Sequence, residues 1–545
     1  MKNNLPVLSL FCAAMLSLSA ADAPSKPNIL LILADDMGFS DPACFGGEIV
    51  TPNIDALARN GLSFTQFYNT ARCWPSRAAL MTGYYAQAVR RDQVAGVPSG
   101  GQGTRPEWAR LLSDRLRIAG YRNYHSGKWH IDGKPLQNGF DHSYVLEDHD
   151  HNFNPKRVLE DDKLLPPIEL KSGYYTSTAF ADHAIKCLKE HAEKYPAQPF
   201  FEYLAFTVPH FPLQAPPEDI AKYRNRYIKG WDVLREERYA RQVAAKIVDT
   251  PISAVEREIG PPYAFPAVLA KLGPNEINRP VAWDTLNDAQ REFQANKMAI
   301  HAAMVDRMDQ EIGRVIAQVK AMGALDNTLI LFLSDNGASA EMMVRGDGHD
   351  PAAPMGSAAT FLSIGPGWST MCNTPYRRHK TWVHEGGIAT PLIVQWPKGI
   401  AAKGELRRTP GHLVDVVPTL LELAGGAAPT EWAGKPCPPA PGISLVPLFT
   451  RDGSVAHDNL WWQHEGNRAL RAGDIKIVAA GKDAPWELYN LRTDRAEAYN
   501  LADTMPDKVK ELAAQWTKQL DSYSALARKD APPGKGSKQP KKEED

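Results

Sequence analysis

The sequence predicts an α/β sandwich with a large, mainly parallel sheet flanked by helices, followed by a small C-terminal α+β subdomain. The first observation is that continuous apolar runs, such as residues 28–34 (NILLILA) and 328–334 (TLILFLS), alternate with amphipathic segments. Such runs are typical of strands buried on both faces of a parallel sheet. The second observation is that the predicted strands become short and closely spaced beyond residue 450.

The remaining elements follow the same alternation. Residues 298–322 give the clearest helix, because their apolar side chains form one stripe that stops at Gly323. Thr51 and Pro52 open a shorter helix that Gly61 ends. We interpret residues 215–297, which are polar and weakly periodic, as an elaboration that helps to shape a substrate cleft. We expect further helices at 107–119, 179–193 and 509–520, and further strands at 62–68, 121–126, 199–207, 460–462, 470, 475–478 and 486–491.

Length and charge limit the possible functions. The chain has 545 residues, enough for one large domain and a smaller one. It carries 62 Lys and Arg against 63 Asp and Glu, so the whole molecule exerts no pull toward nucleic acid or an anionic membrane. We predict a catalytic domain at 21–450, the α+β subdomain at 451–527 and a disordered, charged tail at 528–545.

The N-terminal segment has the features of a secretory signal peptide. Lys2 provides the positive start, residues 5–18 are a short apolar run, and residues 18–20 (LSA) form a cleavage site. The run is too short for a comfortable membrane span, and no later stretch is long and apolar enough for one. We therefore predict that residues 1–20 are removed and that the protein is exported, periplasmic or secreted, without a membrane anchor.

Cysteine usage indicates one unusual residue. Of six cysteines, Cys12 would leave with the signal peptide, and five would remain at positions 44, 73, 187, 372 and 437. An odd number in an oxidising compartment indicates that one is chemically special, while the other four could form up to two disulfide bridges. No Cys-x-x-Cys pair or cysteine–histidine cluster indicates zinc.

Oxygen-bearing side chains follow two of the predicted buried strands. Asp35 and Asp36 end the run at 28–34, and Asp335 and Asn336 follow the strand at 328–334. Ligand sites in open α/β sheets lie at the carboxyl ends of strands, and adjacent carboxylates there repel one another unless a cation lies between them. An all-oxygen set suits calcium or magnesium rather than zinc, although Asp-Asn-Gly is also common in ordinary turns.

The segment from Cys73 to Arg77 (CWPSR) is the most specific feature of the sequence. It could be a loop that opens a helix at Pro75 and buries a structural cysteine. However, together with residues 81–83 (MTG) it resembles the sulfatase signature, Cys-x-Pro-Ser-Arg followed by Leu or Met and then Thr-Gly. In the type I sulfatases that it resembles, a maturation enzyme oxidises the cysteine to Cα-formylglycine. That modification would also explain the odd cysteine.

The resemblance covers nearly the whole chain, in the family's order. One departure is Ala389, where many members have arginine. Residues 373–391 look most like the bacterial arylsulfatase branch. The resemblance implies an alkaline-phosphatase-like sandwich and a sulfuric ester hydrolase of the arylsulfatase type. The matching motifs are Asp35-Asp36-x-Gly38 with Asp41, Thr51-Pro52-Asn53-Ile54-Asp55, Gly127-Lys128-Trp129-His130, Pro209-His210, Arg378-x-Lys380 with Glu385-Gly386-Gly387 and Pro391, and Leu488-Tyr489-Asn490-Leu491 with Asn500-Leu501-Ala502.

The resemblance also implies a cofactor and its ligands. A hydrated aldehyde at position 73 would have two hydroxyls, one to attack sulfur and one to lose a proton and expel the sulfate. One calcium ion would lower the pKa of the attacking hydroxyl. Its ligands would be Asp35, Asp36, Asp335, Asn336 and the modified Cys73.

Five further side chains have implied roles. Arg77 would orient the formylglycine, and Lys128 and Lys380 would neutralise sulfuryl oxygens. His130 would accept the proton of the second hydroxyl, and His210 would donate one to the leaving oxygen.

Two other functions stay open at this point. A phosphate or phosphonate monoesterase of the same superfamily would be favoured by a second complete metal set, which we do not find in the sequence. A non-catalytic sulfated-glycan-binding protein would be supported by loss of Cys73, Lys128 or a metal-binding aspartate, and all are present. The sequence leaves the substrate open between an aryl sulfate and a sulfated glycan. His149 and His151 could line the mouth of the cleft, bind another cation or lie in a solvated loop. Asp347 and His349 follow the turn at 335–337 and could contact the substrate.

Overall fold

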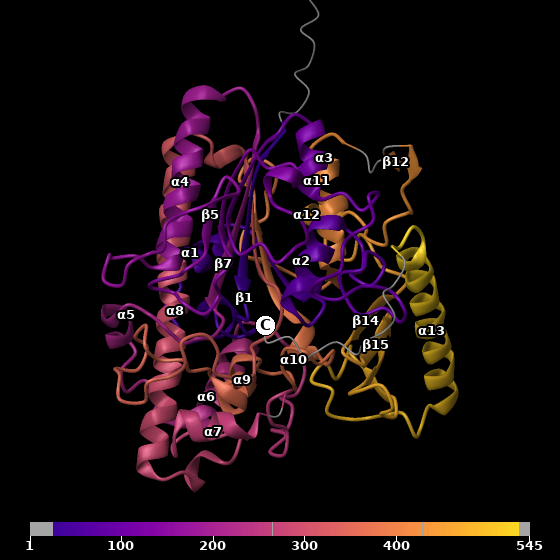
Figure 1. Cartoon of the computed structure of the whole chain (residues 1–545). Helices are drawn as coiled ribbons and strands as arrows, with labels where there is room; N and C mark the ends of the chain where they lie inside the picture. Colours follow the sequence, from indigo (N-terminus) through magenta and orange to yellow (C-terminus); the bar gives the residue numbers. More distant parts are fainter. Residues whose placement is uncertain (1–25, 264, 427–429, 433, 533–545) are drawn as a thin grey trace, which may run out of the picture.

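A large twisted sheet forms the centre of the computed structural model, which describes residues 26–263, 265–426, 430–432 and 434–532 (Figure 1). The predicted signal peptide and residues 533–545 of the predicted tail lie outside these ranges. The strands of the sheet are β1 (Asn28–Asp35), β2 (Leu62–Tyr68), β3 (Arg122–Gly127), β4 (His142–Leu146), β5 (Val158–Glu160), β6 (Lys163–Leu164), β7 (Phe200–Pro209), β8 (Thr328–Ser334), β9 (Ala389–Gln395), β10 (Glu405–Arg407) and β11 (Gly411–His412).

The strand order explains where a site can form. Among the described residues the order is β10-β2-β9-β8-β1-β7-β3-β4-β5-β6, with β11 paired to β2. The central strands β8, β1, β7, β3 and β4 run parallel, whereas β9 runs antiparallel to both of its neighbours. The carboxyl ends of the central strands therefore meet at one edge of the sheet, as predicted for an α/β sandwich.

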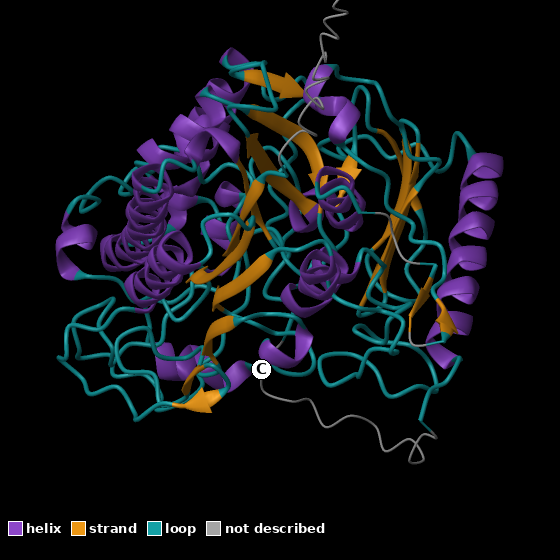
Figure 2. Cartoon of the chain, turned by 90° about the horizontal axis from the view of Figure 1, so that it is seen from above, coloured by secondary structure: helices purple, strands orange, loops and turns teal. Residues whose placement is uncertain are grey.

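Helices cover both faces of the sheet, and Figure 2 shows them in two groups on either side of the strands. The alternation of side chains along β1 explains this arrangement. Leu30 and Ile32 pack in one core, and Leu31 and Leu33 pack in the other. One face carries α1 (Pro52–Arg59), α4 (Thr176–Lys194) and α8 (Asp288–Ala321), and the other carries α2 (Cys73–Thr82), α3 (Leu112–Ile118), α11 (Val416–Leu423) and α12 (Val446–Thr450).

A small antiparallel sheet and one long helix form the C-terminal part of the described chain (Figure 1). Its strands are β14 (Leu460–His464), β15 (Asn467–Ala472), β16 (Ile475–Ala479) and β17 (Glu487–Asn490), and the helix is α13 (Pro506–Arg528). The indole of Trp461 stacks on that of Trp516, with 5.9 Å between ring centroids. The predicted α+β character of this region is confirmed.

The remaining elements are five helices, one hairpin and five 3-10 turns among the described residues. The helices are α5 (Pro217–Ala221), α6 (Gly230–Ala244), α7 (Pro266–Leu272), α9 (Gly365–Cys372) and α10 (Glu385–Ile388), and a separate hairpin joins β12 (Glu431–Trp432) to β13 (Lys435–Pro436). The 3-10 turns are η1 (Ala43–Phe45), η2 (Leu136–Asn138), η3 (Trp283–Thr285), η4 (Leu325–Asn327) and η5 (Leu413–Asp415). Across the described ranges, we find no helix with the length and apolarity that a bilayer span requires.

Several sequence expectations need correction. The helix expected at 107–119 begins only at Leu112, because Trp108 is buried against Tyr84 (5.1 Å between ring centroids) and holds the preceding residues in turns. The helix expected at 298–322 begins at Asp288, where Asn287 and Gln290 form a capping box. Residues 215–297 contain helices α5 to α7 and the start of α8. Their periodicity is weak because polar side chains such as Arg238 are buried on the packed face of α6.

Disulfide bridges are absent among the described cysteines. Cys44, Cys73, Cys187, Cys372 and Cys437 are all free, so the two bridges that the cysteine count allowed do not form. Cys44, Cys73, Cys187 and Cys372 belong to separate elements, and Cys437 follows β13. The thiols of Cys187 and Cys372 instead face imidazoles, at 3.7 Å from His183 Nε2 and 3.9 Å from His301 Nε2.

A buried carboxyl in β7 makes stability depend on pH. Glu202 is fully buried, and neither carboxyl oxygen has a hydrogen-bond partner among the described residues. Burial raises the pKa of Glu202 to about 8. The folded state therefore holds a proton that the unfolded chain releases. The resulting stability is fully present below the unfolded pKa and is lost as the pH rises toward 8.

We expect Glu202→Gln to match the wild type at about pH 5 and to become progressively more stable toward about pH 8. The difference should grow by about 1.4 kcal/mol per pH unit within that window. Thermal unfolding at a series of pH values measures it. Glu193→Gln, on the exposed side of α4, is the matched control and should show no such trend. A difference between Glu202→Gln and wild type that is the same at every pH would contradict the assignment.

Candidate active site

Four neighbouring strands deliver side chains to one point at the carboxyl edge of the sheet. In the order of the strands, β8 is followed by Asp335 and Asn336, β1 ends with Asp35 before Asp36, β7 is followed by His210, and β3 is followed by Lys128 and His130. Residues far apart in the chain thus become neighbours because their strands are parallel and adjacent.

The approach of β3 to β7 requires a glycine before Lys128. Gly127 has φ 127°, and a Cβ atom there would lie 1.8 Å from the carbonyl oxygen of Ala205. The backbone N–H of Lys128 donates to the same carbonyl at 2.8 Å. The Gly-Lys pair of the sequence motif therefore fixes where the ammonium of Lys128 enters the site.

Two further residues reach the site from the other half of the sheet. Cys73 is the first residue of α2, which follows β2 after a short loop. Lys380 precedes α10 and β9, and because β9 is antiparallel its first residue lies at the same edge. The structure brings together all ten residues to which the resemblance assigns a metal-binding or catalytic role.

Each buried carboxylate of the site is paired with a cation. Lys128 Nζ lies 2.7 Å from Asp35 Oδ2, and Lys380 Nζ lies 2.9 Å from Asp36 Oδ1. Arg77 donates to Asp335 Oδ2 from both Nε (3.0 Å) and Nη2 (2.8 Å). All six residues are at most 2% exposed, so these pairs are shielded from water.

Two oxygen atoms in this group are buried without a hydrogen-bond partner among the described residues: Asp35 Oδ1 and Asn336 Oδ1. The amide Nδ2 of Asn336 donates to Asp36 Oδ1 at 2.6 Å, which directs its oxygen elsewhere. Buried oxygens are almost always satisfied, so two unpartnered oxygens among four carboxylate and amide side chains require an explanation. A cation bound by oxygen ligands provides one.

Burial and repulsion between neighbouring carboxylates shift the pKa values of the three aspartates. Burial and the neighbouring Asp35 raise the pKa of Asp335 to about 7, despite Arg77. Burial likewise raises the pKa of Asp36, although Lys380 opposes it. Burial acts in the same direction on Asp35, but Lys128, His210 and Arg77 outweigh it and hold the pKa of Asp35 below its usual range. An added cation would relieve this repulsion.

Cys73 lies inside this ring of charges and is 4% exposed. Burial raises the pKa of the Cys73 thiol, even though Lys128 and Lys380 are close. The unmodified thiol is therefore protonated at neutral pH and is a weak nucleophile. Its position at the N-terminal end of α2, beside two lysines, suits a bound anion.

Two histidines border the same point. His210 donates from Nδ1 to the carbonyl oxygen of Phe211 at 2.6 Å, which leaves Nε2, 3.7 Å from Asp36 Oδ2, without a proton. His130 has φ 53°, and its Nδ1 has no partner among the described residues. Burial, reinforced by Lys380 at His210 and by Lys128 at His130, lowers the pKa of both imidazoles well below the usual value. Both are neutral before a substrate binds.

The structure separates the four histidine and aspartate residues left open by the sequence. The ring of His149 lies 5.8 Å from that of His130, so His149 borders the site. His151 instead pairs with Asp148 at 2.9 Å and Asp347 at 3.2 Å in a surface network. His349 accepts a hydrogen bond from the backbone N–H of Phe361.

Sequence reasoning missed two charged residues of the site. Arg72 directly precedes the signature, and its position alone could have drawn attention to it. Glu341 belongs to no recognisable motif. It is found only because the chain after β8 folds back, which brings Glu341 Oε2 within 2.8 Å of Lys380 Nζ.

Asp41, His301 and Cys372 form a second cluster of side chains of the types that bind metals. Its carboxylate is already neutralised, because Arg238 Nη1 lies 2.8 Å from Asp41 Oδ1. The other oxygen accepts from the backbone N–H of Gly38 and lies 3.0 Å from His301 Nε2. This cluster supports the loop that follows Asp36.

Comparison with known proteins establishes the family. A model of the sulfatase family matches residues 27–427. The chain belongs to the sulfatase family. A second model, described as N-sulphoglucosamine sulphohydrolase, C-terminal, matches residues 377–525. The sulfatase is a sulfuric ester hydrolase with the fold of the alkaline-phosphatase-like superfamily.

Individual relatives cover most of this sulfatase. An uncharacterized sulfatase of Schizosaccharomyces pombe is 33% identical, over 90% of this chain and 93% of its own. An arylsulfatase of Klebsiella aerogenes is 31% identical, over 77% of this chain and 91% of its own. A solved structure in complex with its substrate D-glucosamine-2-N,6-O-disulfate has a TM-score of 0.61 at 20% identity, covering 94% of this chain and all of that one, and shows the shared fold.

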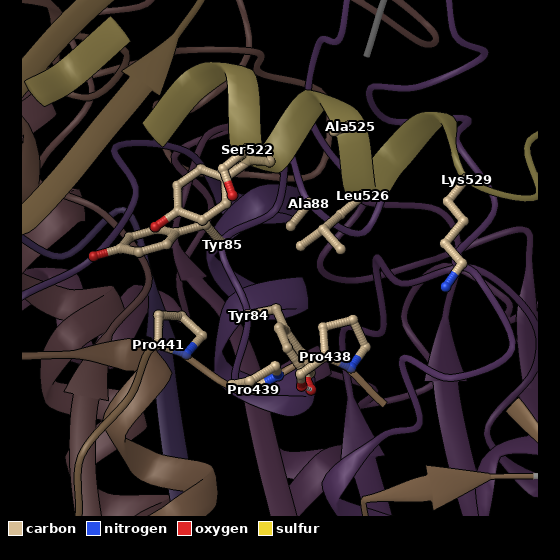
Figure 3. A pocket seen from close by; sticks show the side chains of 11 residues that line it. Tyr84, Tyr85, Ala88, Pro438, Pro439, Pro441, Ser522, Ala525, Leu526 and Lys529 are labelled. Atoms are coloured by element: carbon tan, nitrogen blue, oxygen red, sulfur yellow. Dashed lines mark hydrogen bonds between the residues drawn. The ribbon is translucent and has the colours of Figure 1, made fainter. Parts of the chain in front are cut away.

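A pocket of about 470 Å³ lies away from this site (Figure 3). It is lined by Tyr84, Tyr85 and Ala88, by prolines 438, 439 and 441, by Ser522, Tyr523, Ala525 and Leu526 of α13, and by Lys529. Cys73 begins α2 and Tyr84 follows its other end, so the pocket and the site are about 15 Å apart along that helix. The Tyr84 hydroxyl donates to the Pro438 carbonyl, and the pocket contains no cluster of charged groups.

We expect Arg77→Lys to destabilise the sulfatase by about 3 kcal/mol, because lysine cannot donate at once to Asp335 and to the Lys128 carbonyl. A lowered midpoint of chemical unfolding would show this. Arg314→Lys on α8 is the matched control, since Arg314 also forms an ion pair but is 45% exposed, and its stability should stay near that of wild type. Equal midpoints for both variants would contradict the analysis.

Proposed function

We propose that this sulfatase hydrolyses sulfate monoesters with a formylglycine derived from Cys73 as nucleophile and one calcium ion bound at the carboxyl edge of the sheet. The observation that carries the proposal is the pair of unpartnered, buried oxygens, Asp35 Oδ1 and Asn336 Oδ1, in the charged ring that encloses Cys73. The protonated state of the Cys73 thiol adds support, because a cysteine that is itself the nucleophile would need a lowered pKa.

The residues present fit calcium. Its ligands would be Asp35, Asp36, Asp335, Asn336 and the modified Cys73, all of them oxygen donors once the sulfur is replaced. When bound, calcium would lower the pKa of a hydroxyl of the hydrated aldehyde and so favour attack on sulfur.

The protein's own cations would bind the sulfuryl group. Lys128 and Lys380 enter the ring from opposite sides and would neutralise two sulfuryl oxygens. Arg77 is held by Asp335 and by the Lys128 carbonyl, so it would keep the side chain at position 73 in one orientation. These side chains are almost fully buried, which strengthens each of these interactions.

The two histidines would move protons. His130 is neutral, and its unpartnered Nδ1 leaves it able to accept the proton of the second hydroxyl. His210 would donate from Nε2 to the leaving oxygen. It is neutral in the free protein, and the negative charge of a bound sulfate ester would raise its pKa and favour the protonated form that the role requires.

The substrate would be an aryl sulfate or a sulfated glycan. The arylsulfatase relative supports the first class, and the structure with a sulfated glucosamine supports the second. We further propose that the chain is exported to the periplasm or the medium and that a formylglycine-generating enzyme modifies it. The N-terminal signal features and the Cys73 signature support these proposals.

Production with and without a formylglycine-generating enzyme tests the nucleophile. With the enzyme, the peptide containing residue 73 should lose the mass of H₂S and gain that of one oxygen atom, and sulfate release from an aryl sulfate should appear and stop on calcium chelation. Cys73→Ala should release no sulfate, while Cys437→Ser, a change at a half-buried cysteine, should remain active. Full activity of a protein whose residue 73 stays a thiol would refute the proposal.

The role of His210 predicts a dependence on the leaving group. We expect His210→Gln to lower kcat/KM by about a hundredfold or more for sulfates of weakly acidic phenols, and by about tenfold or less for a nitrophenyl sulfate, whose leaving oxygen needs no proton. A series of aryl sulfates measures the slope of rate against phenol pKa. His349→Gln should keep the wild-type slope. An equal loss across the whole series would exclude proton donation by His210.

A further inference from the structure

Lys380 is shared between two carboxylates. Its Nζ lies 2.9 Å and 3.0 Å from the two oxygens of Asp36 and 2.8 Å from Glu341 Oε2. Lys380 and Glu341 are each 1% exposed, so neither charge is screened by solvent. The pKa of Lys380 is held above its usual range by Asp36 and Glu341, even though burial opposes this. The Lys380 ammonium thus contacts Asp36, which is a proposed calcium ligand, and Glu341, which is not.

Arg72 fixes Glu341 from the opposite side. Its Nη1 lies 3.0 Å from Glu341 Oε1. The same nitrogen donates to Thr381 Oγ1 at 3.0 Å and to the Tyr263 hydroxyl at 2.5 Å. The guanidinium also packs 4.9 Å from the centroid of the Trp74 ring. Glu341 is therefore held between two cations, and its pKa lies below the usual range because Arg72 and Lys380 outweigh the effect of burial.

This arrangement matters when a cation binds. Calcium at Asp36 must compete with the Lys380 ammonium, which contacts both oxygens of that carboxylate. An ammonium that lost its only anionic partner would be left unpaired in a buried site, at a large cost. With Glu341 already in contact, Lys380 can give up Asp36 and remain paired.

We propose that Glu341 is a positioning residue that retains Lys380 in the site while freeing Asp36 for calcium. This inference rests on the proposed function for the identity of the cation. It adds Glu341 and its support Arg72 to the residues on which calcium affinity and the placement of Lys380 depend.

A double-mutant cycle on calcium affinity tests the proposal without any turnover. The full chain is made with Cys73 unmodified, and calcium binding is measured by titration calorimetry and by the calcium dependence of thermal unfolding. We expect Glu341→Gln to weaken calcium binding about tenfold, because Lys380 then has Asp36 as its remaining anionic partner. In the Lys380→Met background the same substitution should change the affinity by about twofold or less.

Two further variants separate contact from charge. Glu465→Gln removes the same charge at the far side of Arg72, where Glu465 Oε2 accepts from the Tyr263 hydroxyl at 2.8 Å, and it should bind calcium like the wild type. Glu341→Asp keeps the charge but is too short to reach Lys380 and Arg72 together, so we expect weaker calcium binding than in wild type. This second variant also tests the proposal if Glu341→Gln does not fold.

The outcomes are distinct. An equal effect of Glu341→Gln with and without Lys380 would overturn the proposal, because Glu341 would then act on calcium by its charge alone. Wild-type affinity in Glu341→Asp would overturn it as well. If the wild type binds calcium and the cycle shows no coupling, the role of Glu341 fails while the calcium site stands. If the wild type binds no calcium, both the calcium site and the role of Glu341 fail.

Discussion

The burial of three carboxylates within one small volume is the constraint on which the site depends. Asp35, Asp36 and Asp335 are at most 2% exposed, and such a group is tolerable only when each charge is compensated. Three cations from three different segments provide that compensation. They can reach the carboxylates only because α2 begins, β3 ends and the segment before β9 lies at the same edge of the sheet. These ion pairs therefore depend on the order and direction of the strands in the sheet.

The sheet keeps those charges in place because it is packed on both faces. Alternate side chains of β1 enter two separate cores, so the strand cannot shift without moving both. The residues that follow the central strands then adopt uncommon backbone conformations, with φ 64° at Asp36 and φ 53° at His130. Strained residues held by a rigid scaffold are typical of a site whose geometry must be set before the substrate arrives.

The sequence predicted secondary structure correctly where the local preference of a segment agrees with its burial in the folded protein. The strands at 62–68 and 328–334 have the predicted ends, because both runs are rich in large apolar and aromatic residues, which favour strands and are buried in the sheet. Prediction failed where tertiary contacts override local preference. Trp108 is held in a turn by its packing against Tyr84. The helical periodicity of α6 is weak because its buried face contains paired polar residues such as Arg238.

The amino-acid sequence by itself identified ten residues of the candidate site, because the signature at Cys73, the acidic residues after apolar strands and the lysine and histidine motifs are contiguous and can be recognised locally. Only the tertiary structure decided which charged side chains contact more than one partner. Lys380 lies between Asp36 and Glu341, and Arg72 joins Glu341 to Tyr263, through contacts between residues that are far apart in the chain. Such pairings depend on distances of about 3 Å across separate elements, and no local pattern encodes them.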